Sequence, residues 1–486
     1  MPAYKNSIRF ILDGKITEID FEKEGLSPTQ TLLHYLRSLP GHKGTKEGCG
    51  EGDCGACTVV LGELINDKIV YKAVDSCLIF LPMVHGKQVI TIENLATHKT
   101  GKTILHPVQQ AVIDENGSQC GFCTPGFIMS IFALYKNETK PSAELIRNAL
   151  AGNLCRCTGY HALLKATQKV FKEKKEDHFS KNEPKVKALL TGLATKDVIT
   201  IESRGQRYLK PFTCQQLLEL KKTFPDALIV SGSTDCGLKV TKKHEVLPLI
   251  IDISDVAQLS VIKKTKNIWH IGAGAKLEII RNAVKKDLPV LYDMLTVFGS
   301  KQIRNMATLG GNVGSASPIG DTLPVLFAHN ATVVLQNTKA EREIPIAGFI
   351  TGYRQTIINK DEVITAIRIP VPDKNSFIKS YKISKRKDLD ISTVSACFNL
   401  ELNGDKVKQI ILAFGGMAAC TQRALKTENF LKGKVWNEKN VQTAMPLIEK
   451  DFSPISDARA GKEMRMMAAK NLLMKLLLDT NEKQIK

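Results

Sequence analysis

Short apolar stretches, separated by polar and glycine-rich turns, run along the first half of the chain. Residues 8–12 are apolar except for Arg9 and lead into Asp13-Gly14, the pattern of a strand entering a tight hairpin turn. Residues 31–37 carry an apolar face at helical spacing. The same spacing predicts three further helices, over residues 126–135, 142–150 and 160–171. Thr124 is the expected N-cap of the first of these, because Pro125 follows it.

The second half of the chain has the same mixture of short elements. Apolar runs predict strands over residues 227–230, 394–400 and 407–414, and helices rich in Leu and Met close the sequence. The length of 486 residues corresponds to about three domains. No apolar run approaches the ~20 residues that cross a bilayer, so we expect no membrane span. The pattern therefore predicts an α+β protein of several domains.

The positive charge lies outside the first third of the chain. The formal net charge is +19, of which residues 1–160 contribute none, residues 161–210 contribute +6 and residues 211–486 contribute +13. A basic chain raises the hypothesis of nucleic-acid binding. In residues 172–210, however, Phe179 and Tyr208 are the only aromatic residues, too few for a base-stacking platform. We therefore expect residues 172–200 to be a solvated linker and expect no nucleic-acid partner.

Cysteine is concentrated where the charge is balanced. Eight of the twelve cysteines precede residue 158. The first residues lack the apolar core of a secretory signal, so we expect a cytoplasmic protein whose thiols stay reduced. Clustered thiols in a reducing compartment are more often metal ligands than disulfides.

The first cysteine quartet consists of Cys49, Cys54, Cys57 and Cys77. Its C-x4-C-x2-C…C spacing is that of a plant-type [2Fe–2S] cluster. The glycines between these cysteines allow the backbone to wrap a cluster closely. Zinc is the alternative, since C-x2-C pairs also bind zinc. The triplet with one distant fourth cysteine favours iron and sulfide.

The second quartet consists of Cys120, Cys123, Cys155 and Cys157. Its two pairs, C-x2-C and C-x-C, flank predicted helices, so two helix ends can present two thiols each to one site. Taken alone this quartet is also compatible with zinc. Beside a ferredoxin-type quartet, a second iron–sulfur cluster is the better interpretation.

Two glycine-rich segments are candidates for binding a nucleotide. No G-x-G-x-x-G fingerprint follows a predicted strand. Residues 227–237, however, form an apolar strand that ends in a turn of small residues, which can offer an anion-binding nest of N–H groups. Residues 305–321 are rich in glycine and hydroxyl groups. From composition alone, a phosphate site and ordinary loops remain alternatives for both.

The cysteine motifs carry a family resemblance. Residues 48–58, 119–126 and 153–160 resemble the iron–sulfur portion of the xanthine oxidase family of molybdenum hydroxylases, and Gln109 and Gln110 fit the same pattern. The resemblance implies a β-grasp [2Fe–2S] ferredoxin domain over residues 1–85 and a four-helix [2Fe–2S] domain over residues 86–171. It further implies an FAD-binding α+β domain of the vanillyl-alcohol-oxidase (PCMH) type over residues 201–372. A small α+β C-terminal flavoprotein domain over residues 376–480 completes the four.

The same resemblance implies which residues contact FAD. Residues 227–237 are similar to the family's pyrophosphate loop, and residues 308–321 are similar to its second flavin motif. Leu389 stands where relatives often carry an acid, so the chain departs from the family pattern at that position. Cys214, Cys236, Cys397 and Cys420 are expected to be free thiols. The implied FAD contacts are Ile229, Val230, Ser231, Gly232, Ser233, Thr234, Asp235, Cys236, Phe298, Thr308, Leu309, Gly310, Gly311, Asn312, Ser315, Asp321, Ile364 and Lys382.

The implied activity is electron transfer. Family members in one chain continue into a molybdopterin-binding region, whereas this sequence ends at Lys486. We therefore expect molybdopterin on a large partner subunit, in a dimer of heterodimers, and no catalytic acid or base on this chain. The implied reaction is xanthine plus water plus NAD giving urate plus NADH. Electrons would pass from molybdenum to the second quartet, then the first, then FAD and NAD. A different heterocycle or aldehyde as substrate, and a stand-alone iron–sulfur flavoprotein reductase, are the alternatives.

Overall fold

A computed structural model describes residues 5–99 and 101–485 of the chain. The chain divides into two compact units. The first unit comprises Met1–Leu220, Asp226–Val256 and Gly299–Ala307. The second unit comprises Lys221–Pro225, Ala257–Phe298 and Thr308–Lys486. The segment expected to form one FAD-binding domain is therefore shared between both units.

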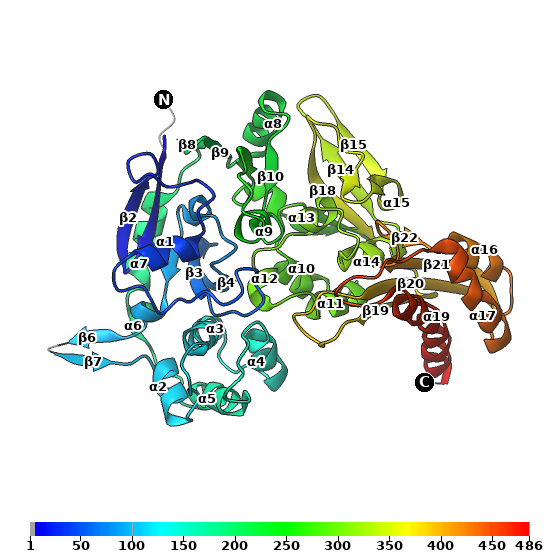
Figure 1. The fold of residues 1–486 in the computed structure, drawn as a ribbon, viewed down its shortest axis with the longest axis horizontal. Coiled ribbons are helices and arrows are strands. Elements are labelled where there is room, and N and C mark those ends of the chain that lie inside the picture. The colour runs from blue at the N-terminus through cyan, green and yellow to red at the C-terminus, as the bar shows by residue number, and fades with distance from the viewer. Residues whose placement is uncertain (1–4, 100, 486) are drawn as a thin grey trace. The chain divides into compact units, whose positions relative to one another are not determined.

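A five-stranded sheet and one crossing helix open the first unit. The strands lie in the order β2-β1-β5-β3-β4, with β1 and β5 parallel. Both hairpins turn through two residues with positive φ, Asp13-Gly14 and Asn66-Asp67. Such turns match the twist of paired strands. The elements, with their colours in Figure 1, are β1 (Ser7–Leu12), β2 (Lys15–Asp20), α1 (Leu32–Ser38), β3 (Thr58–Ile65), β4 (Lys68–Asp75) and β5 (Gln88–Ile90).

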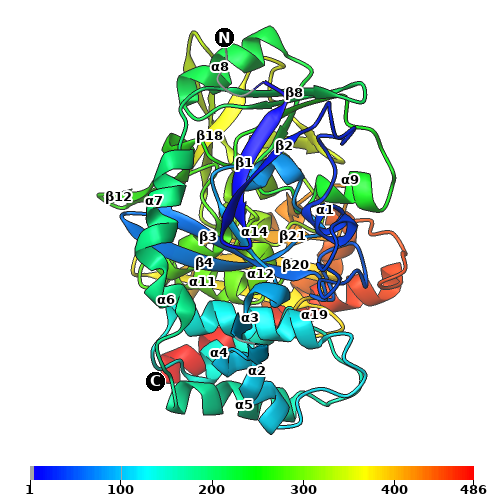
Figure 2. The ribbon, with the colours of Figure 1, turned by 90° about the vertical axis from the view of Figure 1, so that its left-hand side faces the viewer.

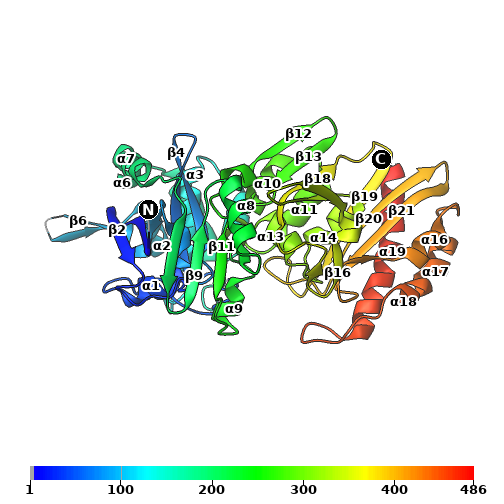
Figure 3. The same cartoon turned by 90° about the horizontal axis from the view of Figure 1, so that it is seen from above.

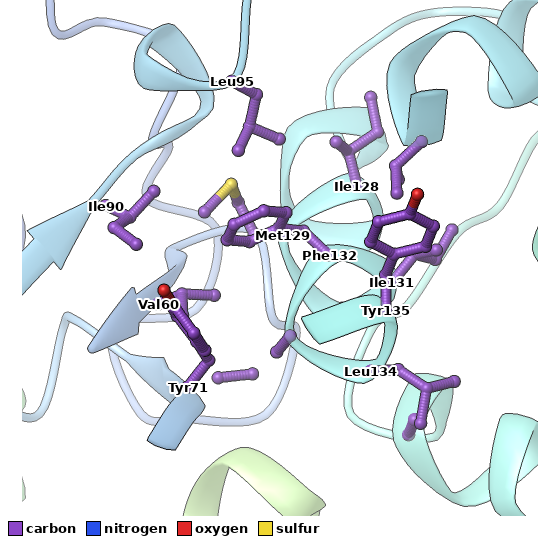
Figure 4. Close-up of a cluster of buried hydrophobic side chains, with 14 of the residues drawn as sticks. Val60, Tyr71, Ile90, Leu95, Ile128, Met129, Ile131, Phe132, Leu134 and Tyr135 are labelled. Atoms are coloured by element: carbon purple, nitrogen blue, oxygen red, sulfur yellow. The ribbon is translucent and has the colours of Figure 1, made fainter. Parts of the chain in front are cut away.

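Helices dominate the next part of the first unit. Figure 2 shows α2, α3, α4 and α5 gathered in one region. Apolar side chains of α3, among them Met129 and Phe132, face Val60, Tyr71 and Ile90 of the sheet (Figure 4). One core therefore joins the sheet to the helices. The elements are β6 (Thr97–Lys99), β7 (Lys102–Ile104), α2 (Pro107–Asp114), α3 (Thr124–Asn137), α4 (Ala143–Leu150), α5 (His161–Lys172), α6 (His178–Lys181) and α7 (Glu183–Leu193).

The expected linker is folded rather than solvated, which corrects the sequence-based expectation for residues 172–200. Helix α7 buries Val186, Leu190 and Leu193 in the core shared by the sheet and the helices. These three positions repeat at helical spacing, so they form one apolar face. Lysines and glutamates surround them in the sequence, so the apolar periodicity of this helix is weak and was not recognised.

A third small sheet completes the first unit. Its strands lie in the order β10-β11-β9-β8, and β10, β11 and β9 are parallel neighbours. Ile201, Tyr208 and Val230 of this sheet share a core with Phe10 and Val59 of the first sheet. The elements are β8 (Ile199–Ser203), β9 (Gln206–Lys210), most of α8 (Cys214–Thr223), β10 (Leu228–Val230), α9 (Gly237–Thr241), β11 (Leu249–Asp252) and α12 (Lys301–Arg304).

The second unit begins with an antiparallel sheet in the order β12-β13-β18-β14-β15. Short helices connect its strands. The elements are β12 (Ile262–Thr265), β13 (Ile268–Gly272), α10 (Leu277–Val284), α11 (Pro289–Thr296), α13 (Leu309–Gly314), α14 (Thr322–Ala328), β14 (Thr332–Gln336), β15 (Glu341–Pro345), α15 (Ile346–Phe349), β16 (Ile350–Gly352), β17 (Gln355–Thr356) and β18 (Val363–Pro370).

A four-stranded sheet with helices beside it ends the second unit. The order is β19-β20-β21-β22, and Figure 3 shows α16 to α19 running beside it. Phe398 and Phe414 of the sheet share a core with Leu473 of α19. The elements are β19 (Ser376–Ile383), β20 (Val394–Asn403), β21 (Lys406–Gly415), β22 (Gln422–Arg423), α16 (Leu425–Leu431), α17 (Glu438–Ala444), α18 (Ile448–Asp451) and α19 (Lys462–Ile485).

The architecture is therefore α+β and multidomain, as the sequence predicts. Across residues 5–99 and 101–485, no helix combines the length and the apolar character needed to cross a membrane.

Candidate redox-cofactor sites

The first cysteine quartet lies in a loop that wraps tightly around Cys49. Gly50, Gly52 and Gly55 have φ values of 65°, 79° and 67°, which side chains disfavour. This backbone directs the N–H groups of Glu51, Asp53 and Cys54 to the Cys49 sulfur, at 3.4, 3.3 and 3.3 Å. N–H groups around sulfur stabilise a thiolate. The Cys54 thiol and these N–H groups lower the pKa of Cys49 to about 5, although burial opposes them.

The four thiols of the first quartet lie in two contacting pairs. Cys49 interacts with Cys54, and Cys57 interacts with Cys77. Both members of the second pair are buried, and Leu33 and Leu78 pack against them. The Cys77 side chain and burial raise the pKa of Cys57. A cation that takes up the thiolates would replace the shared protons.

The second quartet is paired in the same manner. The Cys157 sulfur lies 3.5 Å from the Cys120 sulfur, and Cys123 interacts with Cys155. Cys123, rather than the expected Thr124, is the N-cap of α3. Burial raises the pKa of Cys155, but hydrogen bonds from the Thr158 hydroxyl (3.2 Å) and N–H (3.4 Å) bring it down to about 7.

Exposure distinguishes the two quartets. Cys120 and Cys157 are exposed, whereas Cys57 and Cys77 are buried. Exposed apolar side chains, Phe122 and Leu154, lie next to the second quartet in the sequence. The second site is therefore open at the protein surface through Cys120 and Cys157, whereas the first site combines two buried thiols with the half-buried Cys49 and Cys54.

Paired thiols fit a two-iron cluster better than zinc. Each iron of a [2Fe–2S] cluster takes two protein thiolates, so four ligands divide into two pairs. A single zinc ion gathers three or four ligands around one point. Among the described residues, no group of three or more Cys, His, Asp or Glu side chains could hold one ion. The paired thiols thus fit two [2Fe–2S] clusters, and the eight cysteines remain the proposed ligands.

The predicted pyrophosphate loop lies in the first unit, directly after β10. Ser233 has a φ of 61°, and its carbonyl accepts the N–H of Gly237 at 2.6 Å. A Cβ on Gly232 would clash with the carbonyl oxygen of Met306. The hydroxyls of Ser231 and Ser233 are buried and have no hydrogen-bond partner among the described residues. Two buried hydroxyls that lack partners fit a ligand that accepts hydrogen bonds, such as a phosphate.

The second flavin motif lies in the second unit and forms α13. The Thr308 hydroxyl caps this helix by accepting the N–H of Gly311 at 3.0 Å. Gly310 packs on the backbone of Ala273. The Asn312 amide oxygen accepts the Thr322 hydroxyl at 2.5 Å. The glycines therefore serve close packing here as well as any approach to a ligand.

Asp321 and Lys382, which are 61 residues apart, form a buried ion pair in the second unit. The Lys382 ammonium lies 2.8 Å from Asp321 and also donates to the carbonyl of Val297, which precedes Phe298, at 3.0 Å. The Ser392 hydroxyl donates to the other Asp321 oxygen at 2.5 Å. The structure thus brings together residues that the sequence predicts separately.

The predicted FAD contacts are distributed over both units of the chain. Ile364 is close to Gly314, since a Cβ added at Gly314 would lie 3.2 Å from the Cδ1 atom of Ile364. Leu389 is buried with a φ of 64°. Residues 229–236 belong to the first unit, whereas Phe298, residues 308–321, Ile364 and Lys382 belong to the second.

Two residues escaped prediction although they touch the cluster loops. Asn153 and Gln302 are buried and hydrogen-bonded to each other. Asn153 precedes Cys155 by two positions and opens the family-like block 153–160, but nothing in the sequence indicates its hydrogen bonds. Gln302 lies far along the chain in a segment predicted to bind flavin, so the sequence gives no signal for its contact with the cluster loops.

Four protein families match the chain, one after another. They are described as "2Fe-2S iron-sulfur cluster binding domain" over residues 13–77 and "[2Fe-2S] binding domain" over residues 91–168. "FAD binding domain in molybdopterin dehydrogenase" follows over residues 202–372, and "CO dehydrogenase flavoprotein C-terminal domain" over residues 379–480.

Curated relatives carry these modules inside longer chains. Xanthine dehydrogenase of Emericella nidulans is 33% identical over 93% of this chain and 37% of its own length. Xanthine dehydrogenase/oxidase of Mus musculus is 31% identical over 98% of this chain and 39% of its own length. The chain thus spans well under half of these relatives.

Solved structures share the fold of somewhat more than half of the chain. Quinoline 2-oxidoreductase from Pseudomonas putida 86 is 23% identical with a TM-score of 0.52, covering 57% of this chain and 97% of that chain. Carbon monoxide dehydrogenase from Hydrogenophaga pseudoflava is 23% identical with a TM-score of 0.53, covering 55% of this chain and 94% of that chain.

Fold, thiol pairs and matching domains define an iron–sulfur flavoprotein with two [2Fe–2S] domains. The chain belongs to the xanthine oxidase family of molybdenum hydroxylases, of which it carries the iron–sulfur and FAD modules.

Proposed function

We propose that the chain is the electron-transfer part of a xanthine dehydrogenase. It would take electrons from xanthine, oxidised at a molybdopterin centre on a large partner subunit, and deliver them to NAD in the cytoplasm. The observation that carries this proposal is the arrangement of four thiol pairs in a chain that also holds an FAD-binding domain. Two clusters supply single-electron carriers, and FAD joins single-electron steps to hydride transfer.

The residues of the chain bind and tune these groups. The N–H groups around Cys49 and the Thr158 groups around Cys155 stabilise thiolates, and hydrogen bonds to cluster sulfur adjust a potential. The exposed second quartet suits entry of electrons from a partner. The first quartet has no exposed thiol and buries Cys57 and Cys77, so it suits an internal relay.

The flavin contacts remain those proposed from the resemblance. Ser231 and Ser233 would donate hydroxyl hydrogen bonds to the pyrophosphate, because nothing among the described residues accepts them. The Lys382–Asp321 pair would position the ammonium beside the flavin. Phe298 and Ile364 would supply apolar contact with the ring system.

Xanthine as the substrate is proposed from the names of the relatives, and NAD as the acceptor is proposed from the family resemblance of the sequence. Several curated relatives are xanthine dehydrogenases, whereas the structural likeness to quinoline and carbon monoxide enzymes is one of fold. Another heterocycle or an aldehyde as substrate is the nearest alternative, followed by a stand-alone reductase.

The substrate is tested with the complex as it is isolated from its source through a tag on this chain. The proposal expects a large molybdopterin protein to co-purify and xanthine to reduce NAD. Preferential oxidation of quinoline or an aldehyde would replace xanthine as the substrate. A chain that oxidises NADH with dyes and binds no large partner would be a stand-alone reductase, which contradicts the proposal.

The ligand assignment is tested by replacing one thiol of each quartet. Cys54→Ser and Cys155→Ser should each remove about half of the expected ~4 irons per chain, because each [2Fe–2S] cluster needs four thiolates. Cys214→Ser is the matched control, since Cys214 lies on α8 outside both quartets. Iron and acid-labile sulfide are measured on the purified protein. Full iron in either quartet variant would contradict the assignment.

A further inference from the structure

A short segment of the flavin sequence is built into the iron–sulfur part of the first unit. Residues 299–307 fall inside the segment that matches the FAD-binding family, yet they pack with the first unit. Their helix α12 is capped by the buried Ser300, whose hydroxyl accepts the N–H of Ile303 at 3.1 Å. The segment is therefore held in a defined conformation.

This segment contacts both cluster-bearing regions. A Cβ on Gly52, in the first quartet's loop, would lie 2.8 Å from Ile303 Cδ1. The Asn305 amide donates to the carbonyl of Ala73 on β4 at 2.8 Å. Arg304 donates to the side-chain oxygen of Asn148 on α4 at 2.5 Å. One segment thus reaches the ferredoxin sheet and the helical region together.

Gln302 lies at the centre of these contacts and is fully buried. Its amide nitrogen donates to the Ser130 hydroxyl and to the Asn153 side-chain oxygen, both at 3.1 Å. The Ser130 hydroxyl also donates to Asn153, at 2.6 Å. These three polar side chains form a closed triangle in an apolar interior, where hydrogen bonds are strong and costly to break.

Asn153 connects this triangle to both cluster loops. Its amide nitrogen donates to the Gly55 carbonyl at 3.0 Å and to the Thr58 hydroxyl at 3.2 Å. The adjacent Leu154 N–H donates to the Cys54 carbonyl at 3.0 Å. Leu154 precedes Cys155, so a backbone hydrogen bond directly joins a ligand residue of one quartet to the neighbour of a ligand in the other.

The segments around these hydrogen bonds are closely packed at two glycines, Gly126 and Gly152. A Cβ on Gly126 would clash with the Gly55 carbonyl oxygen, and a Cβ on Gly152 would lie 2.5 Å from Ser300 Cβ. Gln302 therefore holds the oxygen of the Asn153 side-chain amide, whose nitrogen holds the Gly55 carbonyl.

We propose that Gln302 is a positioning residue that fixes the separation of the two cluster-bearing loops, and with it the electron transfer between the clusters. The inference rests on the proposed function, because it takes the two quartets to hold [2Fe–2S] clusters. Electron tunnelling falls steeply with distance, so a brace that holds the two loops together sets the rate between them without touching either cluster.

The test variant is Gln302→Leu in the isolated holoenzyme. Leu keeps a similar volume, and Oε1 of Gln302 accepts no hydrogen bond from the described residues, so the change removes only the two donated bonds. Ser130→Ala removes one corner of the triangle and serves where the first variant folds poorly. Gln442→Leu, on the exposed face of α17, is the matched control.

The readout is the magnetic splitting between the two reduced clusters in low-temperature electron paramagnetic resonance. Two nearby unpaired spins split each other's lines, and the splitting changes when their separation changes. Gln302→Leu and Ser130→Ala should alter or lose the splitting while iron stays at the wild-type level, and flavin reduction by the partner's substrate should slow. Gln442→Leu should match wild type in both.

Two other outcomes are separate failures. Unchanged splitting and electron-transfer rate in Gln302→Leu, or loss of iron without any change in splitting of the loaded molecules, would overturn the positioning role. A wild-type protein without two iron–sulfur signals would instead overturn the proposed function itself.

Discussion

Glycines in this chain stand where two backbones approach too closely for a side chain. In α13, a Cβ on Gly310 would lie 2.5 Å from Ala273 Cβ and 2.6 Å from its carbonyl oxygen. In α15, a Cβ on Gly348 would meet no atom within 4 Å. Both positions are helical, so alanine changes the helix propensity in the same way at each. Only Gly310 is crowded, so a difference between the two variants reports on packing.

Gly310→Ala should destabilise the second unit by about 2 kcal/mol and lower its FAD content, because overpacking shifts the backbone of the flavin motif. Gly348→Ala should be neutral or stabilise by up to about 1 kcal/mol. FAD per chain and the urea midpoint measure both effects. Wild-type FAD content and stability in Gly310→Ala would contradict this packing.

A buried histidine makes the second unit sensitive to mild acid. Burial lowers the pKa of His329 from 6.5 to about 4, although its Nδ1 atom hydrogen-bonds the Pro370 carbonyl at 3.2 Å. The unfolded chain binds a proton below pH 6.5, whereas the folded chain does so only near pH 4. The free energy of unfolding therefore falls as pH drops from 6.5 towards 4. At pH 5 it is lower than at neutral pH by about 2 kcal/mol.

The measurement is the urea midpoint at pH 7 and pH 5 followed by tryptophan fluorescence. Both tryptophans, Trp269 and Trp436, lie in the second unit. His329→Gln should flatten the pH dependence, and the exposed His98→Gln should leave it as in wild type. An equal slope in wild type and His329→Gln would contradict the buried neutral imidazole.

The cysteines could be predicted from the sequence as metal-ligand candidates. Polar pairs between residues far apart in the sequence could not. Thiol spacing indicates both quartets as metal-ligand candidates, and the position of the second quartet beside the ferredoxin-type first quartet favours [2Fe–2S] over zinc there. Gln302 and Asn153 meet across 149 positions, and Asp321 and Lys382 across 61. Amide and ion pairs of this kind carry no local pattern, so only the folded chain reveals them.

At the scale of elements, α7 shows how charge conceals structure. Leu190 is buried in the core that joins the first sheet to the helices, whereas the neighbouring Thr191 is exposed. Leu190→Ala should lower the free energy of unfolding by about 3 kcal/mol, because it leaves a cavity in this core. Thr191→Ala should change stability by less than about 0.5 kcal/mol.

The readout is the rate of tryptic cleavage within the lysine-rich residues 172–187, which follows local opening. Cleavage should accelerate in Leu190→Ala alone. Equal rates in wild type and Leu190→Ala would mean that this segment is the solvated linker its charge first indicates.

Elements with a clear local signal agree with the sequence. The hairpin at Asp13-Gly14, helix α1 and strands β20 and β21 all lie where apolar pattern and turn residues predict them. Helix α7 was not predicted because its apolar face covers only three positions in a stretch dominated by lysine and glutamate.

At the scale of the whole molecule, the domain set follows from the motifs, but the division into units does not. Residues 299–307 leave the sequence neighbours with which they match one family and pack with the first unit. That choice depends on contacts such as Ile303 with the Gly52 loop, between residues about 250 positions apart along the chain.

The proposed function depends on two [2Fe–2S] clusters in this chain. The most direct measurement is spin quantitation by electron paramagnetic resonance of the dithionite-reduced, purified protein. Two distinct iron–sulfur signals that integrate to about two spins per chain are the predicted result. A colourless zinc protein without a signal, or one signal of about one spin, would contradict the proposed function.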